Sequence, residues 1–170
     1  DTWVRVLDGY LKTTKHDHAL MALYRLAEDV GALQNARQYT DMTQALIIAG
    51  FGQEAERVMQ KGIDASLFAG DEATRAKRTI DAAKRKADAE RAALPKAASA
   101  LAAAKTGDEM EKVGELYFSA GDYVNASAAL QKAIAKGGLS DADSAQMLLG
   151  IALKRKGDKA NATKAFDLVK

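Results

Sequence analysis

Two stretches of this chain follow the same pattern: GELYFSAGDYVNASAALQKAI at 114–134 and GIALKRKGDKANATKAF at 150–166. Each starts with a glycine. A bulky residue, a Gly-Asp pair, an alanine and a large apolar residue follow in that order. The residues on either side of the Gly-Asp pair favour helices with one apolar face. Each stretch therefore predicts two helices joined by a tight turn.

Weaker copies of this pattern occur earlier in the chain. When the copies are aligned on their alanine, they lie at Ala19, Ala55, Ala126 and Ala162. The first two alanines and the last two are each 36 positions apart, and the gap of 71 between the pairs is close to two units. A period in this range indicates stacked pairs of helices, each too thin to bury its own apolar face.

The pattern resembles the tetratricopeptide repeat (TPR), a helix–turn–helix unit. This resemblance implies an all-α fold, a right-handed superhelical solenoid of TPR-like hairpins that extends over residues 1–170. We predict two hairpins in 1–63, an irregular hairpin with a long charged helix in 64–106, and two well-formed repeats in 107–170. The family pattern also predicts that Gly114 and Gly150 lie where two helices approach closely.

The chain departs from the family pattern in several places. Leu7 and Thr43 occupy the first small-residue slot of the early copies, and Gly137-Gly138 stands once where the family has a closing proline. The last repeat has no polar capping helix, which solenoids usually need for solubility. We therefore expect the natural protein to be longer. The amino-acid sequence of 1–63 resembles the sequences of exported bacterial repeat proteins. We therefore expect a periplasmic location, with a cytoplasmic one as the alternative.

Composition narrows the class of protein. With 170 residues there is room for one domain or one run of repeats. A single proline, Pro95, and the lack of alternating β-branched runs argue against a sheet. The absence of cysteine excludes disulfides, zinc-thiolate sites and a cysteine nucleophile. No apolar run approaches the roughly 18 residues that a membrane span needs.

Groups with catalytic or metal-binding potential are few. His16 and His18 flank Asp17 in one turn, but the sequence offers no convincing third and fourth ligand. Acids spaced at i, i+2 diverge on a helix and suit the dipole of its first turn. Three such pairs occur: Glu109/Glu111, Asp141/Asp143 and Glu54/Glu56. Because phosphate loops, nucleophile elbows and HExxH are also lacking, we predict a non-enzymatic protein with no metal and no cofactor.

A long charged helix is predicted over 72–94. Between positions 75 and 91 it carries seven cations against three acids: Arg75, Lys77, Arg78, Lys84, Arg85, Lys86 and Arg91 against Asp81, Asp88 and Glu90. A basic face of this kind could hold a polyanion, either nucleic acid or acidic lipid. The acids also lie at helical spacing from the cations and could pair with them. Because the net charge is only +2, we expect a solvated face and no nucleic-acid partner, with polyanion binding as the alternative.

In the TPR family the first helices of successive hairpins line a concave groove. The resemblance assigns these groove positions: Val4, Asp8, Leu11, Thr40, Gln44, Ile47, Glu111, Glu115, Phe118, Met147, Ile151 and Lys154. The Lys and Asn that hold a C-terminal carboxylate in the family are absent, so no such clamp is predicted. Four of the assigned residues form an apolar row that suits a peptide or an amphipathic helix: Leu11, Ile47, Phe118 and Ile151. The alternative is that a segment of the same protein outside these 170 residues covers this row.

The sequence therefore predicts a non-catalytic scaffold that binds a peptide or protein partner in its concave groove. Two alternatives remain open. The helix over 72–94 could bind a polyanion, or the chain could be a structural arm of a larger protein.

Overall fold

The computed structural model describes residues 2–13 and 17–169, and all regular structure in these ranges is helical. The elements are α1 (Thr2–Thr13), α2 (Asp17–Asp29), α3 (Ala36–Ala49), α4 (Gly52–Asp64), α5 (Asp71–Ala93), the 3₁₀ turn η1 (Leu94–Lys96), α6 (Ala97–Ala103), α7 (Gly107–Ser119), α8 (Tyr123–Lys136), α9 (Ala142–Lys156) and α10 (Lys159–Phe166). The prediction of an all-α fold is confirmed. Within these residues, none of the helices combines the length and apolar character required to cross a membrane.

Helices α3, α7, α8, α9 and α10 begin after residues whose side chains accept a backbone N–H group of the first turn. At the start of α9, Asp141 accepts the N–H of Ser144 at 2.9 Å. Thr106 and Glu109 form a reciprocal capping box at α7. Asp122 and Asp158, the acids of the two Gly-Asp pairs, cap α8 and α10. Each Gly-Asp pair therefore marks a turn, because its aspartate satisfies N–H groups that the following helix leaves free.

The four C-terminal helices stack in chain order, each against the next. A Cβ atom built on Gly114 would lie 2.8 Å from Cγ of Leu130, and one on Gly150 would lie 2.4 Å from Cε1 of Phe166. Leu130 and Phe166 are the large apolar residues of the same two sequence copies. The prediction that Gly114 and Gly150 lie at close helix contacts is confirmed.

The N-terminal half is built around α3 and α4, and α5 packs along α4. Met42, Leu46 and Met59 are fully buried there. The contact between α4 and α5 is very close, because a Cβ on Gly52 would lie 2.1 Å from the backbone N of Ala87. Only the absence of a side chain at Gly52 and small residues on α5 allow the two backbones to approach so closely.

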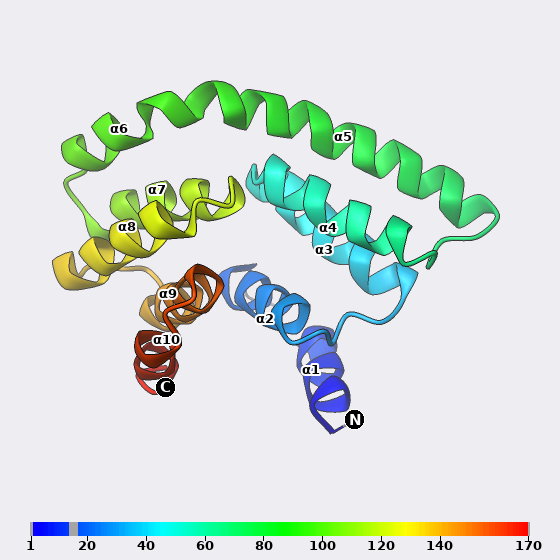
Figure 1. Cartoon of the computed structure of the whole chain (residues 1–170), viewed down its shortest axis with the longest axis horizontal. Coiled ribbons are helices and arrows are strands. Elements are labelled where there is room, and N and C mark those ends of the chain that lie inside the picture. The colour runs from blue at the N-terminus through cyan, green and yellow to red at the C-terminus, as the bar shows by residue number, and fades with distance from the viewer. Residues whose placement is uncertain (1, 14–16, 170) are drawn as a thin grey trace.

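The segment after α4 does not form the third hairpin that we predicted. Helix α5 ends at Ala93, close to Pro95 as expected, but α6 continues in the same general direction and packs on α7 (Figure 1). Ala93, Leu94, Lys96 and Ala97 all keep right-handed helical backbone angles. The chain therefore tightens for one 3₁₀ turn without reversing. Together α5 and α6 form one arc that covers both halves of the molecule (Figure 1).

The two halves also meet on the side opposite this arc. Helix α2 packs against α9 more extensively than against α3, its neighbour in sequence. Leu26 of α2 packs against the C-terminal core, which contains Phe118 and Ile151. The predicted open groove is therefore wrong in its central part, because α2 of the same chain occupies it.

Candidate functional site

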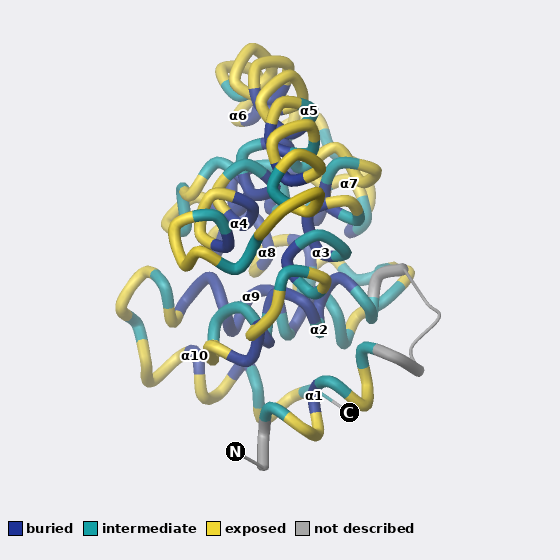
Figure 2. Tube along the Cα trace, turned by 90° about the vertical axis from the view of Figure 1, so that its right-hand side faces the viewer, coloured by how far each residue is buried: buried dark blue, intermediate teal, exposed yellow. Residues whose placement is uncertain are grey.

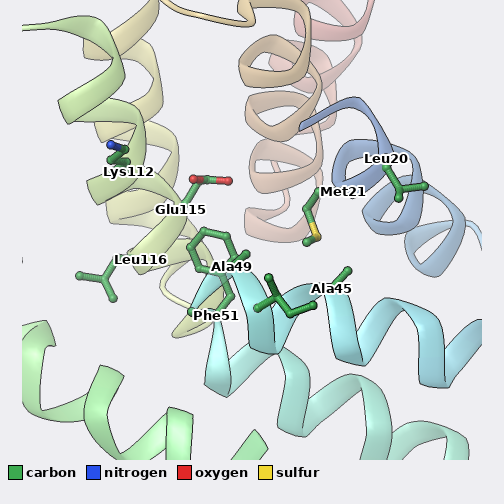
Figure 3. A pocket seen from close by; sticks show the side chains of 10 residues that line it. Leu20, Met21, Ala45, Ala49, Phe51, Lys112, Glu115 and Leu116 are labelled. Carbon is green, nitrogen blue, oxygen red and sulfur yellow. The ribbon is translucent and has the colours of Figure 1, made fainter. Parts of the chain in front are cut away.

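A cleft of about 580 Å³ opens between α2, the end of α3 and α7. Figure 3 shows Met21 and Phe51 at its centre, with Ala45 and Ala49 on one side and Glu115 and Leu116 on another. Most of its lining is apolar: Leu20, Met21, Ala45, Ile48, Ala49, Gly50, Phe51 and Leu116, with Lys112 and Glu115 from α7.

The local sequence of α3 explains why this space stays open. Ala45 and Ala49 are four residues apart, so both lie on the same face of α3 and neither fills the space beside it. Helix α3 then ends at Gly50, whose φ of 91° turns the chain sharply into α4. Ile48 remains 86% exposed at the edge of the cleft. Its exposure is unusual for a large aliphatic side chain beside an apolar cleft, so this edge can receive an apolar group of another molecule.

Behind the cleft lies a buried ion-pair cluster around Arg25, which is 2% exposed. Its Nε and Nη2 donate to the carboxylate of Glu54 at 3.0 and 2.9 Å, and its Nη1 donates to Glu115 Oε1 at 3.1 Å. Burial alone lowers the pKa of Arg25, but Glu54 and Glu115 outweigh burial and raise it. Arg25 therefore stays charged, and it ties α2 to α4 and to α7 at one point.

Aromatic rings continue this cluster. The Arg25 guanidinium lies 5.1 Å from the centroids of both Phe51 and Phe118. Arg155 of α9 lies 5.1 Å from Phe118 and 5.5 Å from Tyr123. Phe118 is thus in contact with two guanidinium groups that come from different helices. Such cation–π contacts add attraction that ordinary apolar packing does not provide.

A second set of ion pairs joins the end of α2 to α9. Lys154 Nζ lies 2.6 Å from Asp29 Oδ2, and Arg155 Nε lies 3.1 Å from Asp29 Oδ1. Arg155 also pairs with Glu28. Together with Arg25, these contacts join α2 to α4, α7 and α9.

Glu111 is buried close to this cluster, and it lines a small cavity of about 20 Å³ together with Arg25, Glu115 and Ser144. Burial raises the pKa of Glu111 to about 7, and the carboxylates of Glu115, Asp108 and Asp141 also contribute to the rise. Arg25 acts in the opposite direction. Near neutral pH this side chain changes between its neutral and its charged form inside the junction of the two halves.

The twelve residues that the resemblance assigned to a groove do not form one surface. Val4, Leu11 and Ile47 are half-buried against the N-terminal core, whereas Met147 is partly buried against the C-terminal one. Phe118 and Ile151 are fully buried, so the prediction that they face an open groove is wrong. Helix α2 contributes to this burial, because Arg25 lies over the Phe118 ring and α2 packs on α9.

The polar members of the assigned set have separate roles. Asp8 accepts a hydrogen bond from Gln38 Nε2 at 3.2 Å, and the Thr40 hydroxyl donates to the carbonyl oxygen of Ala36 at 2.9 Å. Gln44 is exposed on α3. The structure brings Glu111 and Glu115 together at the junction, and Lys154 contributes to the neighbouring pair with Asp29. Of the twelve residues, Glu115 alone lines the cleft.

Sequence reasoning missed the residues that build the junction. Arg25 and Phe51 were not predicted as site residues, nor were the cleft residues Leu20 and Met21, and Glu54 was considered only as a member of an acid pair. One signal was available: Arg25 is the one charged residue in the apolar stretch ALMALYRLA at 19–27. A lone cation at such a position predicts a buried ion pair, although the sequence does not indicate which acids complete it.

The acid pairs considered for catalysis have structural partners. Glu54 pairs with Arg25, Glu56 with Arg91, and Asp141 caps α9. Across residues 2–13 and 17–169, no group of three or more His, Cys, Asp or Glu side chains could hold a metal ion. The side chains of His16 and His18 lie outside the described part of the structure.

Comparison with known proteins returned no matching family model, curated protein or solved structure.

Proposed function

We propose that this chain is a non-catalytic interaction scaffold whose cleft between α2, α3 and α7 receives apolar side chains of a protein partner. The observation that carries the proposal is an open apolar cleft of about 580 Å³ with Ile48 exposed at its edge. Pockets that hold ligands commonly have volumes of about 300–1,000 Å³. The ion pairs of α2 support this function because they fix one wall of the cleft in place before a partner arrives.

The charges at the rim indicate the chemistry of the partner. Glu115 is already paired with Arg25, whereas Lys112 is exposed and has no ion pair among the described residues. A partner with an acidic side chain beside its apolar ones would complement Lys112. We therefore propose an amphipathic helix that presents at least two large apolar residues on one face and an acid next to them.

We also propose that α7–α10 are two repeats of the TPR type. The alanines of their aligned slots, Ala126 and Ala162, are buried, and the glycine slots contact Leu130 and Phe166. The proposal of an exported, periplasmic protein depends on the sequence resemblance of 1–63 alone.

Synthetic peptides test the function directly. We would measure the fluorescence anisotropy of labelled amphipathic peptides with leucines at helical spacing, in one version flanked by Glu and in a matched version flanked by Lys. The Glu version should bind more tightly. Ala49→Trp, which places a large ring in the cleft, should reduce the affinity by tenfold or more, which corresponds to about 1.4 kcal/mol.

Ala128→Trp is the matched control, because Ala128 is exposed on α8, away from the cleft. It should leave peptide binding unchanged. Equal binding by the parent, Ala49→Trp and Ala128→Trp proteins would place the peptide on another surface and reject the proposal.

A further inference from the structure

A second surface, separate from the cleft, carries a dense positive charge. Six cations lie exposed on α5 between positions 75 and 86, and Asp81 is the one acid in that stretch: Arg75, Lys77, Arg78, Lys84, Arg85 and Lys86. Figure 2 shows α5 as a narrow ridge above the other helices, with its buried residues turned toward the helices beneath it. We call this surface the α5 ridge.

The cations of the α5 ridge are not neutralised by neighbouring acids. Among the described residues, none of the six forms an ion pair, so the expected pairing of acids with cations is absent at positions 75–86. Asp88 instead pairs with Arg91 at 2.9 Å. Glu90 is buried and accepts the backbone N–H of Gln53 at 2.7 Å. The argument that interleaved acids cancel the basic face therefore fails for positions 75–86.

The six cations are arranged in three rows along the helix. With about 100° of rotation per residue, Arg78 and Arg85 lie on the crest, opposite the buried residues Ala76, Ala83 and Ala87. Lys77 and Lys84 lie on one flank, and Arg75 and Lys86 lie on the other. Positive charge therefore surrounds the whole exposed half of the helix.

This shape favours a grooved polyanion over a flat one. A membrane surface would meet mainly the crest, and α5 offers it no apolar face because Ala76, Ile80, Ala83 and Ala87 are buried. The major groove of B-form DNA is about 12 Å wide and admits a helix, whose diameter with side chains is about 10–12 Å. Cations on both flanks would then face the phosphates of both groove walls.

Other nucleic acids fit this surface less well. The major groove of double-stranded RNA is deep and narrow, and α5 contains no aromatic residue on which an unpaired base could stack. We propose that the α5 ridge binds the major groove of double-stranded DNA, mainly through phosphate contacts and without strong sequence preference.

Fluorescence anisotropy with a short labelled DNA duplex of mixed sequence tests this proposal. If six cations each meet a phosphate, the affinity should fall about a thousandfold between about 50 and 200 mM salt. The variant Lys84→Gln/Arg85→Gln/Lys86→Gln should bind at least tenfold more weakly and show a shallower dependence on salt. Asp81→Asn should bind more tightly, because it removes the one acid of the ridge.

The matched control removes three exposed lysines elsewhere: Lys132→Gln/Lys159→Gln/Lys164→Gln. Its net charge equals that of the ridge variant, so DNA binding within a factor of two of the parent would assign the effect to α5. An equal loss in both variants would show that total charge matters and would overturn the proposal. Binding to vesicles rich in phosphatidylserine but not to the duplex would also overturn it, in favour of a membrane. Thermal melting should be unchanged in all variants, since every changed side chain is exposed.

Discussion

The guanidinium of Arg25 lies 5.1 Å from the centroid of the Phe118 ring, although α2 and α7 come from opposite halves of the chain. Both residues are buried, and the same guanidinium is bound to Glu54 and Glu115. One side chain thus connects three helices that are distant in sequence. Helix α2, which also packs on α1, is thereby joined to helices of both halves.

Removing the charge of Arg25 should destabilise the protein strongly. Arg25→Met leaves Glu54 buried without its partner, and the loss of one member of such a pair costs about 3–5 kcal/mol. Urea unfolding monitored by circular dichroism measures this change. Arg91→Met, in an exposed pair with Asp88 and Glu56, is the control and should cost at most about 1 kcal/mol.

The double variant Arg25→Met/Glu54→Leu replaces both charged side chains by apolar ones of similar size. It therefore tests the effect of the charges while the volume stays filled. It should recover part of the stability that Arg25→Met loses, because the buried charge of Glu54 is removed and only Glu115, whose side chain is closer to solvent, is left without Arg25. If Arg25→Met were as stable as the parent, the junction would not depend on this ion pair.

Stability should depend on the protonation of Glu111. Its pKa is raised to about 7 in the folded protein, against about 4.3 for an unperturbed glutamate. The folded state therefore binds this proton more tightly, and the stability it provides is lost as pH rises from about 4.3 through 7. Between pH 5 and 8 the free energy of unfolding should fall in the parent relative to Glu111→Gln, by at most about 3 kcal/mol.

Urea titrations at several pH values measure this difference, with Glu72→Gln on the exposed first turn of α5 as the control. The groups around Glu111 are Glu115, Asp108, Asp141 and Arg25, and none of them is changed in either variant. Parallel pH profiles for the parent and Glu111→Gln would contradict the prediction.

The contact between α4 and α5 should not tolerate even a methyl group at position 52. A Cβ there would meet backbone atoms of Lys86 and Ala87, which cannot rotate away. Gly52→Ala should therefore lower stability by about 1–3 kcal/mol or more. Gly9→Ala on α1 is the matched control, because nothing lies within 4 Å of its Cβ position, and it should stabilise by about 0.5–1 kcal/mol. If Gly52→Ala and Gly9→Ala had equal midpoints of thermal unfolding, α4 and α5 could move apart without loss of stability. That result would contradict the prediction.

Phe118 and Ile48 should respond in opposite ways to substitution. Phe118→Ala removes a fully buried ring from between two guanidinium groups and should cost about 3–5 kcal/mol. Ile48→Asp changes an exposed side chain, so its melting temperature should match the parent while peptide binding in the cleft is lost. If Ile48→Asp still binds the Glu-flanked peptide as the parent does, this edge is not part of the site.

The sequence was a good guide where structure is local. Gly121-Asp122 and Gly157-Asp158 lie in turns, and Gly114 and Gly150 lie at close helix contacts, as predicted. These features depend on residues a few positions apart or on a pattern repeated at a fixed spacing. The cleft was not predictable in this way, because its walls come from α2, α3 and α7 and its shape depends on how they meet.

The sequence by itself determined the helices, their ends and the packing of α7–α10, because backbone hydrogen bonding and apolar periodicity act over short distances. Tertiary structure alone decided that 94–97 continues forward, that α2 lies against α9, and that Phe118 and Ile151 are buried. The position of α2 and the burial of Phe118 involve the buried charge of Arg25, which pairs with acids on α4 and α7. No local pattern encodes which acids a buried cation will reach once the chain has folded.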